Sequence, residues 1–233
     1  IHRDIRAFYV DDAAKYEADN NKKLKIRRIY EMIPSNLESK KKRVVFQDIE
    51  DKRGKRFSDY QDEFEYLISA GIVLDVNAIS TPVFPLTQAV GKNLLKLYLN
   101  DVGLLTDVLY GSNIRAILDD ETGINLGSVY ESVVAQELAA HGCKLFYYDN
   151  RNKGEVDYLI DDYDSLSAVP IEVKSGKDYT IHSALSAFVK NEDYHVKKAY
   201  VLSNTREITT NGKITYIPIY DVMFLGTAEN TTS

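Results

Sequence analysis

The feature that most constrains the fold is the alternation of helical and strand-like patterns in the second part of the chain. The helical patterns have apolar residues three and four positions apart, as in Val133, Val134 and Leu138, and Gly142 is the natural stop after the first of them. The order is helix, three strands, helix and two further strands, over residues 129–141, 144–148, 155–160, 168–174, 181–190, 198–202 and 214–220. This order predicts an α/β domain with a central mixed β-sheet flanked by helices. Pro218 suggests an edge or a bend in the last strand.

The first part of the chain has a different pattern, with helices followed by strands. Ser58 is a candidate N-cap for a helix that Gly71 would end, and residues 72–76 form an apolar, strand-like segment. An earlier helix is expected to stop at Pro34, and its apolar residues recur at helical spacing: Ile26, Ile29, Tyr30 and Ile33. Two helices followed by a strand pair predict a winged-helix-like α+β domain.

The composition changes near Gly91, which is the predicted domain boundary. Residues 1–90 hold 16 basic and 15 acidic side chains, whereas residues 91–233 hold 13 basic and 20 acidic ones. We therefore expect a first domain over 1–90, a second over 91–226 and a polar tail over 227–233. The second domain is expected to open with a helix-like stretch over 94–105.

A basic segment, residues 22–56, stands out within the first domain because it holds 13 basic and only 5 acidic side chains. Clustered lysines and arginines neutralise phosphates and bind nucleic acid in a salt-dependent way. A solvated surface with basic loops accounts for the same composition. The candidate nucleic-acid contacts are Lys40, Lys41, Lys42, Arg43, Arg53, Lys55 and Arg56.

Few residues in the chain could bind a soft metal or form disulfides. The single cysteine, Cys143, excludes a disulfide framework and favours a reducing, cytoplasmic setting. The four histidines have no metal-ligand spacing, although His182 follows the 168–174 strand closely enough to touch a substrate. No apolar run reaches the length of a membrane helix, so no membrane association is expected. The start at Ile1 suggests a C-terminal part of a longer protein.

Acidic side chains occur on two successive predicted strands. Glu155 and Asp157 are two residues apart on one strand, and Glu172 and Lys174 are two apart on the next. Residues two apart share a face, so pairing of the strands would bring the carboxylates together. Mg²⁺ relieves repulsion between such carboxylates and is held by one or two of them with water and substrate phosphate. Ordinary ion pairs at the strand ends are the alternative reading.

These residues resemble the pattern of the PD-(D/E)xK nuclease superfamily. Glu131 lies on the preceding helix, Asp157 on a strand, and Glu172 and Lys174 flank Val173 on the next strand; Val156 replaces the usual proline. The resemblance implies that Asp157, Glu172 and Glu131 hold Mg²⁺ or Mn²⁺. It also implies that Lys174 acts with these three carboxylates in catalysis.

A wider resemblance covers roughly residues 20–225. The chain is similar to the uncharacterised C-terminal region, a domain of unknown function, of bacterial and archaeal AAA+ ATPases, through residues 84–86, 96–105, 127–131, 154–158, 171–176 and 217–220. The resemblance implies a winged-helix-like segment followed by a restriction-endonuclease-like domain, with an ATPase domain ahead of both. The chain itself has no P-loop, because neither Gly91-Lys92 nor Gly176-Lys177 has the required flanking residues. We therefore expect no ATP to bind these residues.

The sequence leaves three functions open. The first is a Mg²⁺-dependent nuclease module of an ATPase, which would hydrolyse phosphodiesters of nucleic acid. The second is a catalytically inactive nuclease-like fold that serves as a DNA-binding or protein-interaction module of the ATPase. The third is a structural region that forms homo-oligomers or contacts the ATPase domain of the same protein.

Overall fold

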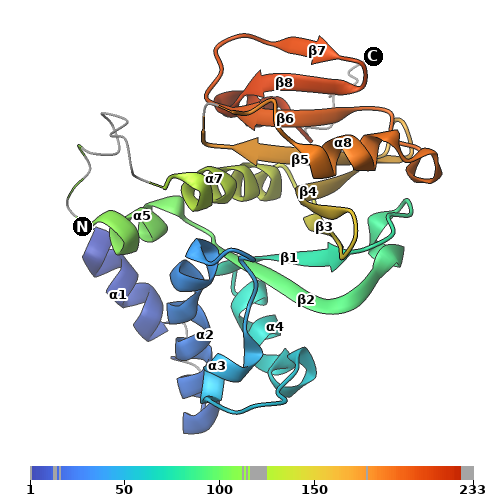
Figure 1. Ribbon diagram of the computed structural model, residues 1–233. Coiled ribbons are helices and arrows are strands. Elements are labelled where there is room, and N and C mark those ends of the chain that lie inside the picture. Colours follow the sequence, from blue (N-terminus) through green and yellow to red (C-terminus); the bar gives the residue numbers. More distant parts are fainter. Residues whose placement is uncertain are drawn as a thin grey trace, which may run out of the picture. The chain divides into compact units, whose positions relative to one another are not determined.

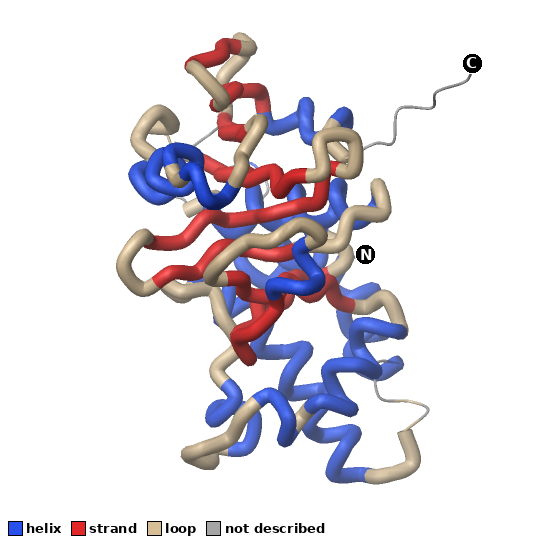
Figure 2. The backbone as a smooth tube through the Cα atoms, turned by 90° about the vertical axis from the view of Figure 1, so that its right-hand side faces the viewer, coloured by secondary structure: helices blue, strands red, loops and turns tan. Residues whose placement is uncertain are grey.

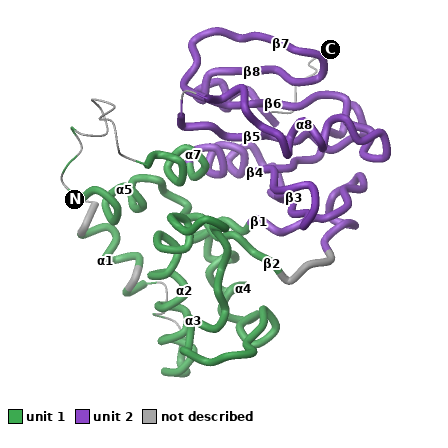
Figure 3. Tube along the Cα trace, viewed as in Figure 1, with its two compact units in different colours: residues 1–75, 93–132 green, residues 76–92, 133–233 purple. Residues whose placement is uncertain are grey.

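The computed structural model describes residues 2–12, 15, 17–111, 113, 115, 125–176 and 178–226. The chain forms two compact units, coloured separately in Figure 3: residues 1–75 with 93–132, and residues 76–92 with 133–233. The predicted boundary after residue 90 stays a prediction, and it falls at the first residue of strand β2 (Val90–Leu99). The predicted polar tail lies outside the described residues.

The first unit is mostly helical (Figure 1). Its core contains apolar side chains of the second helix, among them Ile26 and Ile29, together with Phe64 and Leu67 of the fourth. Spacing of three and four residues places these side chains on one face of each helix. The described helices of the first unit include α1 (His2–Asp12), α2 (Asn20–Glu38), α3 (Phe46–Glu50), η1 (Phe57–Asp59), α4 (Gln61–Ser69) and α5 (Val102–Tyr110).

The expectation that Pro34 ends a helix is wrong, because α2 continues through Pro34 to Glu38. Proline inside a helix removes one backbone hydrogen bond and crowds the preceding turn. Here Ile33, Pro34 and Leu37 are all buried, and burial of an apolar side chain stabilises by about 1.5–3 kcal/mol. Packing of this turn therefore outweighs the local cost of the proline.

The ends of α4 confirm one prediction and contradict another. Ser58 is exposed and lies within η1, and the N-cap position is Tyr60, whose side chain makes no capping hydrogen bond. At the other end Gly71 has a φ of +67°, and its N–H donates to the carbonyl of Ile68. Glycine adopts this left-handed conformation without a Cβ clash, which explains why the helix stops there.

The helix expected over residues 94–105 is also wrong. Residues up to Leu99 form strand β2, and α5 begins only after Asp101. Residues 95–99 are all buried, so both faces of the strand are covered. Asp101 then caps α5, because its Oδ1 accepts the N–H of Gly103 at 2.7 Å.

The strands form one mixed eight-stranded sheet in the order β2-β1-β3-β4-β5-β6-β8-β7, and the strands of the second unit lie side by side in both views (Figure 1 and Figure 2). Pairs β3–β4, β4–β5 and β7–β8 are antiparallel, whereas β1–β3, β5–β6 and β6–β8 are parallel. The predicted central mixed sheet is thus confirmed. The other strands are β1 (Val73–Ile79), β3 (Phe146–Asn150), β4 (Gly154–Asp162), β5 (Ser167–Lys174), β6 (Ala199–Ser203), β7 (Thr209–Asn211) and β8 (Ile214–Pro218).

Helices α7 (Gly127–Ala140) and α8 (Ser183–Lys190) occur where the sequence predicts them. Gly142 follows α7 with a φ of +81°, and the chain turns there into the segment leading to β3. Leu185 and Phe188 of α8 pack into a core cluster with Tyr148 and Val156 of the sheet. Helix α8 therefore covers the face of β4 and β5 to which these side chains belong.

Short 3-10 helices complete the second unit: η2 (Leu86–Ala89), η3 (Glu192–Tyr194) and η4 (Ile219–Phe224). Strand β8 lies between β6 and β7, so Pro218 is not on an edge strand; it ends β8, and η4 starts at the next residue. The predicted bend is confirmed. Among the described residues, no helix combines the length and the apolar character needed to cross a bilayer.

Candidate active site on strands β4 and β5

A β-bulge in β4 places Asp157. Phe146 of β3 pairs with Leu159 of β4, and Tyr148 pairs with Val156, so two steps along β3 match three along β4. In a regular strand, residues three positions apart point to opposite faces. Because of the bulge, Val156 and Leu159 belong to the same core cluster. Bulges turn a side chain out of the regular alternation and occur often beside functional sites.

Asp157 also joins β4 to β5. The last regular pair between the strands is Tyr158 with Ile171, and the next interaction is a side-chain one. Oδ2 of Asp157 accepts the backbone N–H of Val173 at 2.8 Å. This hydrogen bond lies where the regular backbone pairing between β4 and β5 ends, and it orients the Asp157 carboxylate beside β5.

Glu172 is the buried carboxylate of the site, with an exposed fraction of 6%. Its Oε1 lies 2.7 Å from Nζ of Lys174. Its Oε2 is buried and has no hydrogen-bond partner among the described residues. An unsatisfied buried oxygen costs free energy and is uncommon away from functional or solvent-filled sites.

The environment of Glu172 raises the pKa of its carboxyl group to about 7. The largest cause is burial, which penalises the charged form, and the neighbouring Asp157 charge raises the pKa further. Lys174 acts in the opposite direction through its charge and its hydrogen bond, and so does a positive charge on His182. The positive charges near Glu172 therefore do not offset burial and the Asp157 charge. A bound cation would add positive charge and favour the ionised form of Glu172.

Lys174 is the last residue of β5 and is half-exposed, with 31% of its side chain accessible. It pairs in register with the buried Ser203 of β6. The ammonium group therefore contacts Glu172 while part of the side chain faces solvent. Glu155, two residues before Asp157, is half-buried at the start of β4, and its role stays open.

Sequence reasoning missed two residues beside this site, Tyr216 and Ser186. His182 has an exposed fraction of 8%, and its Nε2 lies 2.7 Å from the hydroxyl of Tyr216. Its Nδ1 lies 3.1 Å from Oγ of Ser186. Tyr216 is 34 residues from His182 along the chain, and only the pairing of β8 with β6 places it here.

Glu131 belongs to the first unit, in the first turns of α7. It is buried, with an exposed fraction of 4%, and forms an ion pair with Lys42. The hydroxyl of Tyr98 donates a hydrogen bond to its Oε2 at 3.1 Å. The predicted role of Glu131 as a third metal ligand stays a prediction.

The described residues contain no group of three or more His, Cys, Asp or Glu side chains arranged to hold a metal ion. Two carboxylates are nevertheless sufficient for Mg²⁺, which usually keeps several waters and takes further oxygens from substrate phosphate. The buried, unsatisfied Oε2 of Glu172 and the nearby Asp157 charge fit a hard divalent cation of this kind.

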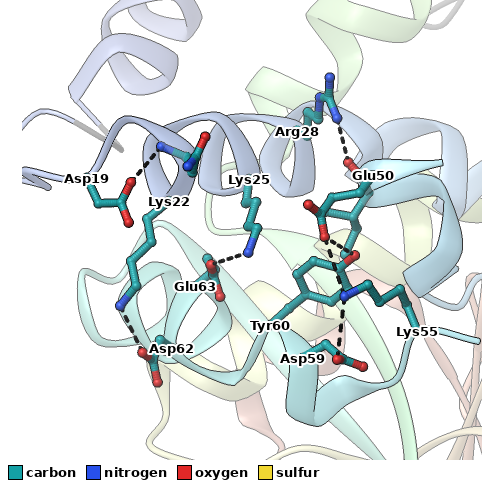
Figure 4. Close-up of polar contacts among 12 residues, drawn as sticks. Asp19, Lys22, Lys25, Arg28, Glu50, Lys55, Asp59, Tyr60, Asp62 and Glu63 are labelled. Atoms are coloured by element: carbon teal, nitrogen blue, oxygen red, sulfur yellow. Dashed lines mark hydrogen bonds and ion pairs between the residues drawn. The ribbon is translucent and has the colours of Figure 1, made fainter. Parts of the chain in front are cut away.

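The residues predicted to contact nucleic acid differ in their exposure to solvent. The exposed ones are Lys40, Lys41, Arg53 and Arg56, and the half-buried ones are Lys42, Arg43 and Lys55. Figure 4 shows that Lys55 reaches both Glu50 and Asp59, at 3.8 Å and 3.6 Å. Two nearby lysines also form ion pairs with acidic residues: Lys22 with Asp62 at 2.9 Å and Lys25 with Glu63 at 3.5 Å.

Much of the excess positive charge in the basic segment is thus neutralised within the first unit. Surface ion pairs of this kind are weak, typically below about 1 kcal/mol, so they do not lock the side chains. The four exposed residues remain the best candidates for phosphate contacts.

Two family models match the chain. Residues 126–222 match a domain of unknown function (DUF4143), and residues 1–114 match another domain of unknown function (DUF8612). The second part of the chain therefore contains an uncharacterised domain, and this match includes Asp157, Glu172 and Lys174. No curated protein matches the chain, and no solved structure matches it either.

Proposed function

We propose that β4 and β5 carry a Mg²⁺- or Mn²⁺-dependent nuclease site that hydrolyses phosphodiesters of nucleic acid. The observation that supports this most is the pair of carboxylates Asp157 and Glu172, of which Glu172 is buried with one oxygen that lacks a hydrogen-bond partner among the described residues. Lys174 lies at the end of the same strand, 2.7 Å from Glu172. This combination provides two hard oxygen ligands and one cationic group within a single unit.

Asp157 and Glu172 would hold the metal ion. Burial and then the neighbouring Asp157 charge raise the Glu172 pKa, so added positive charge would favour ionisation of Glu172. A bound divalent cation would supply that charge and would polarise the scissile phosphodiester. The Val173 N–H orients the Asp157 carboxylate, because it donates a hydrogen bond to Oδ2 at 2.8 Å.

Lys174 would stabilise the charge that develops on the phosphate. Its ammonium group is compact, carries three donors and is partly accessible to solvent. The ion pair with Glu172 holds the ammonium group at the strand end. Pre-oriented positive charge at this position lowers the transition-state energy more than the ground-state energy.

The domain context supports the same proposal. The match to DUF4143, a domain found in AAA-ATPase-associated proteins, agrees with the resemblance to ATPase C-terminal regions. On this basis we infer a winged-helix-like first domain, a restriction-endonuclease-like second domain and a cytoplasmic protein whose ATPase domain precedes them. Self-association through these domains is part of the inference.

A cleavage assay tests the nuclease proposal. Plasmid, single-stranded and double-stranded oligonucleotides would be incubated in Mg²⁺ and in Mn²⁺ with the native chain, with Lys174→Ala and with Asp157→Asn. Lys190→Ala is the matched control, because Lys190 is an exposed lysine at the end of α8. We expect cleavage by the native chain and by Lys190→Ala, and loss of cleavage in the other two variants and in EDTA.

Equal cleavage by all four proteins would contradict the proposal, since it would indicate a contaminating nuclease. Absence of cleavage by the native chain with either metal would also count against it. In that case the second function would be favoured, an inactive nuclease-like fold that binds DNA or a protein. The exposed residues Lys40, Lys41, Arg53 and Arg56 support that alternative, and a steep salt dependence of DNA binding would be its signature.

A further inference from the structure

An aromatic pair lies beside the candidate site in the second unit. The rings of Tyr179 and Tyr216 have centroids 6.1 Å apart and planes at 64°, which is an edge-to-face contact. Both side chains are half-buried, so each combines a packed part with an accessible part. Tyr179 lies between the end of β5 and α8, five residues after Lys174.

The sheet register places Tyr216 on the same row as Glu172. Glu172 pairs with Val201 of β6, and Val201 pairs with Tyr216 of β8. Residues paired in this way share a face, and neighbouring strands are about 4.8 Å apart, so the two backbone positions are separated by about 10 Å. The spacing is comparable to the reach from the base to the phosphate of one nucleotide.

His182 fixes the aromatic pair in this position. Its Nε2 lies 2.7 Å from the Tyr216 hydroxyl, and the two rings are 5.6 Å apart. Its Nδ1 contacts Ser186, so both ring nitrogens have a hydroxyl partner. A positive charge on His182 lowers the pKa of Glu172, although burial and the Asp157 charge outweigh it.

We propose that Tyr179 and Tyr216 bind an unpaired nucleobase of the strand whose phosphate contacts Glu172-bound metal and Lys174. This inference rests on the proposed nuclease function and names its substrate class, a single strand or a strand with an unpaired base. Base–aromatic stacking tolerates any base, because every base has a π-face. A base inside a duplex is already stacked on its neighbours and would have to leave the helix to reach the rings.

The charge state of the pair suits a nucleic acid. Burial raises the pKa of Tyr216, and the neighbouring Tyr179 raises it further. The phenol therefore stays neutral at physiological pH and does not repel the phosphate backbone. The Tyr216 hydroxyl contacts His182 and its ring packs partly on the core, so the accessible part of the Tyr179–Tyr216 pair is what a base would contact.

Equilibrium binding tests the inference without requiring cleavage. The full chain would be titrated, by fluorescence anisotropy with Ca²⁺ in place of Mg²⁺, into a labelled single strand of about 12 nucleotides, a length within the usual site sizes. The comparison ligands are the duplex of the same sequence and the same strand with abasic positions. The variants are Tyr179→Ala, Tyr179→Phe and the control Tyr163→Ala, since Tyr163 is an exposed tyrosine on the β4–β5 turn.

We expect Tyr179→Ala to weaken binding of the single strand by about five- to a hundredfold, the usual effect of removing one stacking ring. Tyr179→Phe and Tyr163→Ala should bind as the native chain does, because the first keeps the ring and the second lies elsewhere. The abasic strand should bind the native chain weakly and should lose little further affinity in Tyr179→Ala. The duplex should be insensitive to Tyr179.

Full affinity in Tyr179→Ala, or equal loss for duplex and single strand, would overturn the inference, as would failure of the native chain to bind any strand. The cleavage assay separates this result from the nuclease proposal. If Lys174→Ala abolishes cleavage while Tyr179→Ala binds normally, the nuclease proposal stands and the base contact is wrong. If binding depends on Tyr179 but no cleavage occurs, the base contact stands and the catalytic proposal is wrong.

Discussion

The side chain of Asp157 accepts the backbone N–H of Val173 at 2.8 Å, so one carboxylate serves both the sheet and the candidate site. The hydrogen bond lies where regular pairing between β4 and β5 ends. The same carboxylate contributes to the raised pKa of Glu172. Structural and chemical roles can therefore be separated by substitutions that change the charge of Asp157 and keep its acceptor.

Removal of the Asp157 acceptor should destabilise the second unit. Asp157→Ala leaves the Val173 N–H without this acceptor, and we expect the free energy of unfolding in urea to fall by about 1–3 kcal/mol. Asp157→Asn keeps a carbonyl oxygen and should be closer to the native stability. Both variants should lose Mg²⁺-dependent activity. Equal stability of native and Asp157→Ala would show that the hydrogen bond contributes nothing.

The raised pKa of Glu172 predicts a pH-dependent stability. The folded pKa of about 7 exceeds the ordinary value of 4.5, so the folded state holds the proton more tightly than the unfolded state. The contribution of Glu172 to stability is therefore greatest below about pH 4.5 and is lost as pH rises towards 7. The total loss is on the order of 3 kcal/mol.

Glu172→Gln provides the matched comparison for this prediction, because glutamine is similar in shape and does not titrate. Urea unfolding at pH 5 and pH 8 should show a smaller decrease for Glu172→Gln than for the native chain. Addition of Mg²⁺ at pH 8 should recover stability in the native chain through binding to the folded state. Parallel pH profiles of the two proteins would contradict the assignment.

The Lys42–Glu131 ion pair should be important for the stability of the first unit. Lys42→Met would remove the ion pair that Lys42 forms with the carboxylate of Glu131, which is 4% exposed. We expect a loss of about 2–3 kcal/mol, less than for a fully buried pair because the Lys42 side chain is 21% exposed. Lys41→Met, at an exposed position, should change stability by less than about 0.5 kcal/mol.

A double variant completes this test. Lys42→Met combined with Glu131→Gln removes both charges and should regain part of the stability that Lys42→Met loses. If the double variant is as unstable as the sum of the single ones, the pair does not interact in the folded state. Thermal unfolding at one ionic strength is sufficient for the comparison.

Substitution of an exposed lysine should weaken DNA binding more than substitution of a lysine that forms ion pairs within the first unit. If the basic segment contacts phosphates, Lys40→Gln and Lys41→Gln should each reduce the slope of log affinity against log salt by about one. Lys55→Gln should have a smaller effect, because Lys55 already contacts Glu50 and Asp59. Equal effects of the three substitutions would show that these ion pairs open on binding.

The sequence predicts most of the second unit because its elements depend on local patterns. Helix α7 ends at a glycine with positive φ, and the strands before α8 are short apolar runs separated by polar turns. The predictions that are wrong, at Pro34 and over residues 94–105, concern segments in which tertiary burial overrides the local signal. Leu95 and Leu97 are spaced as for a strand, yet the neighbouring Leu94 and Tyr98 are apolar too, so the alternation is incomplete.

The candidate site is only partly predictable for a similar reason. The sequence predicts Asp157, Glu172 and Lys174, because they lie close together along the chain on adjacent strands. Tyr216 could not be found, because its approach to His182 depends on strand order across β6 and β8. The bulge at Asp157 was missed because an extra residue in one strand has no signature in the sequence of that strand alone.

The bulge makes β4 sensitive to the number of its residues. Val156 and Leu159 face the same core because one extra position lies between the paired segments. Deletion of either Asp157 or Tyr158 would restore regular pairing and shorten the connection, but deletion of Asp157 would also remove a site carboxylate. Insertion of one residue there would turn every later side chain of β4 to the opposite face. Length changes in this strand should therefore be excluded in functional relatives, even where individual residues are free to vary.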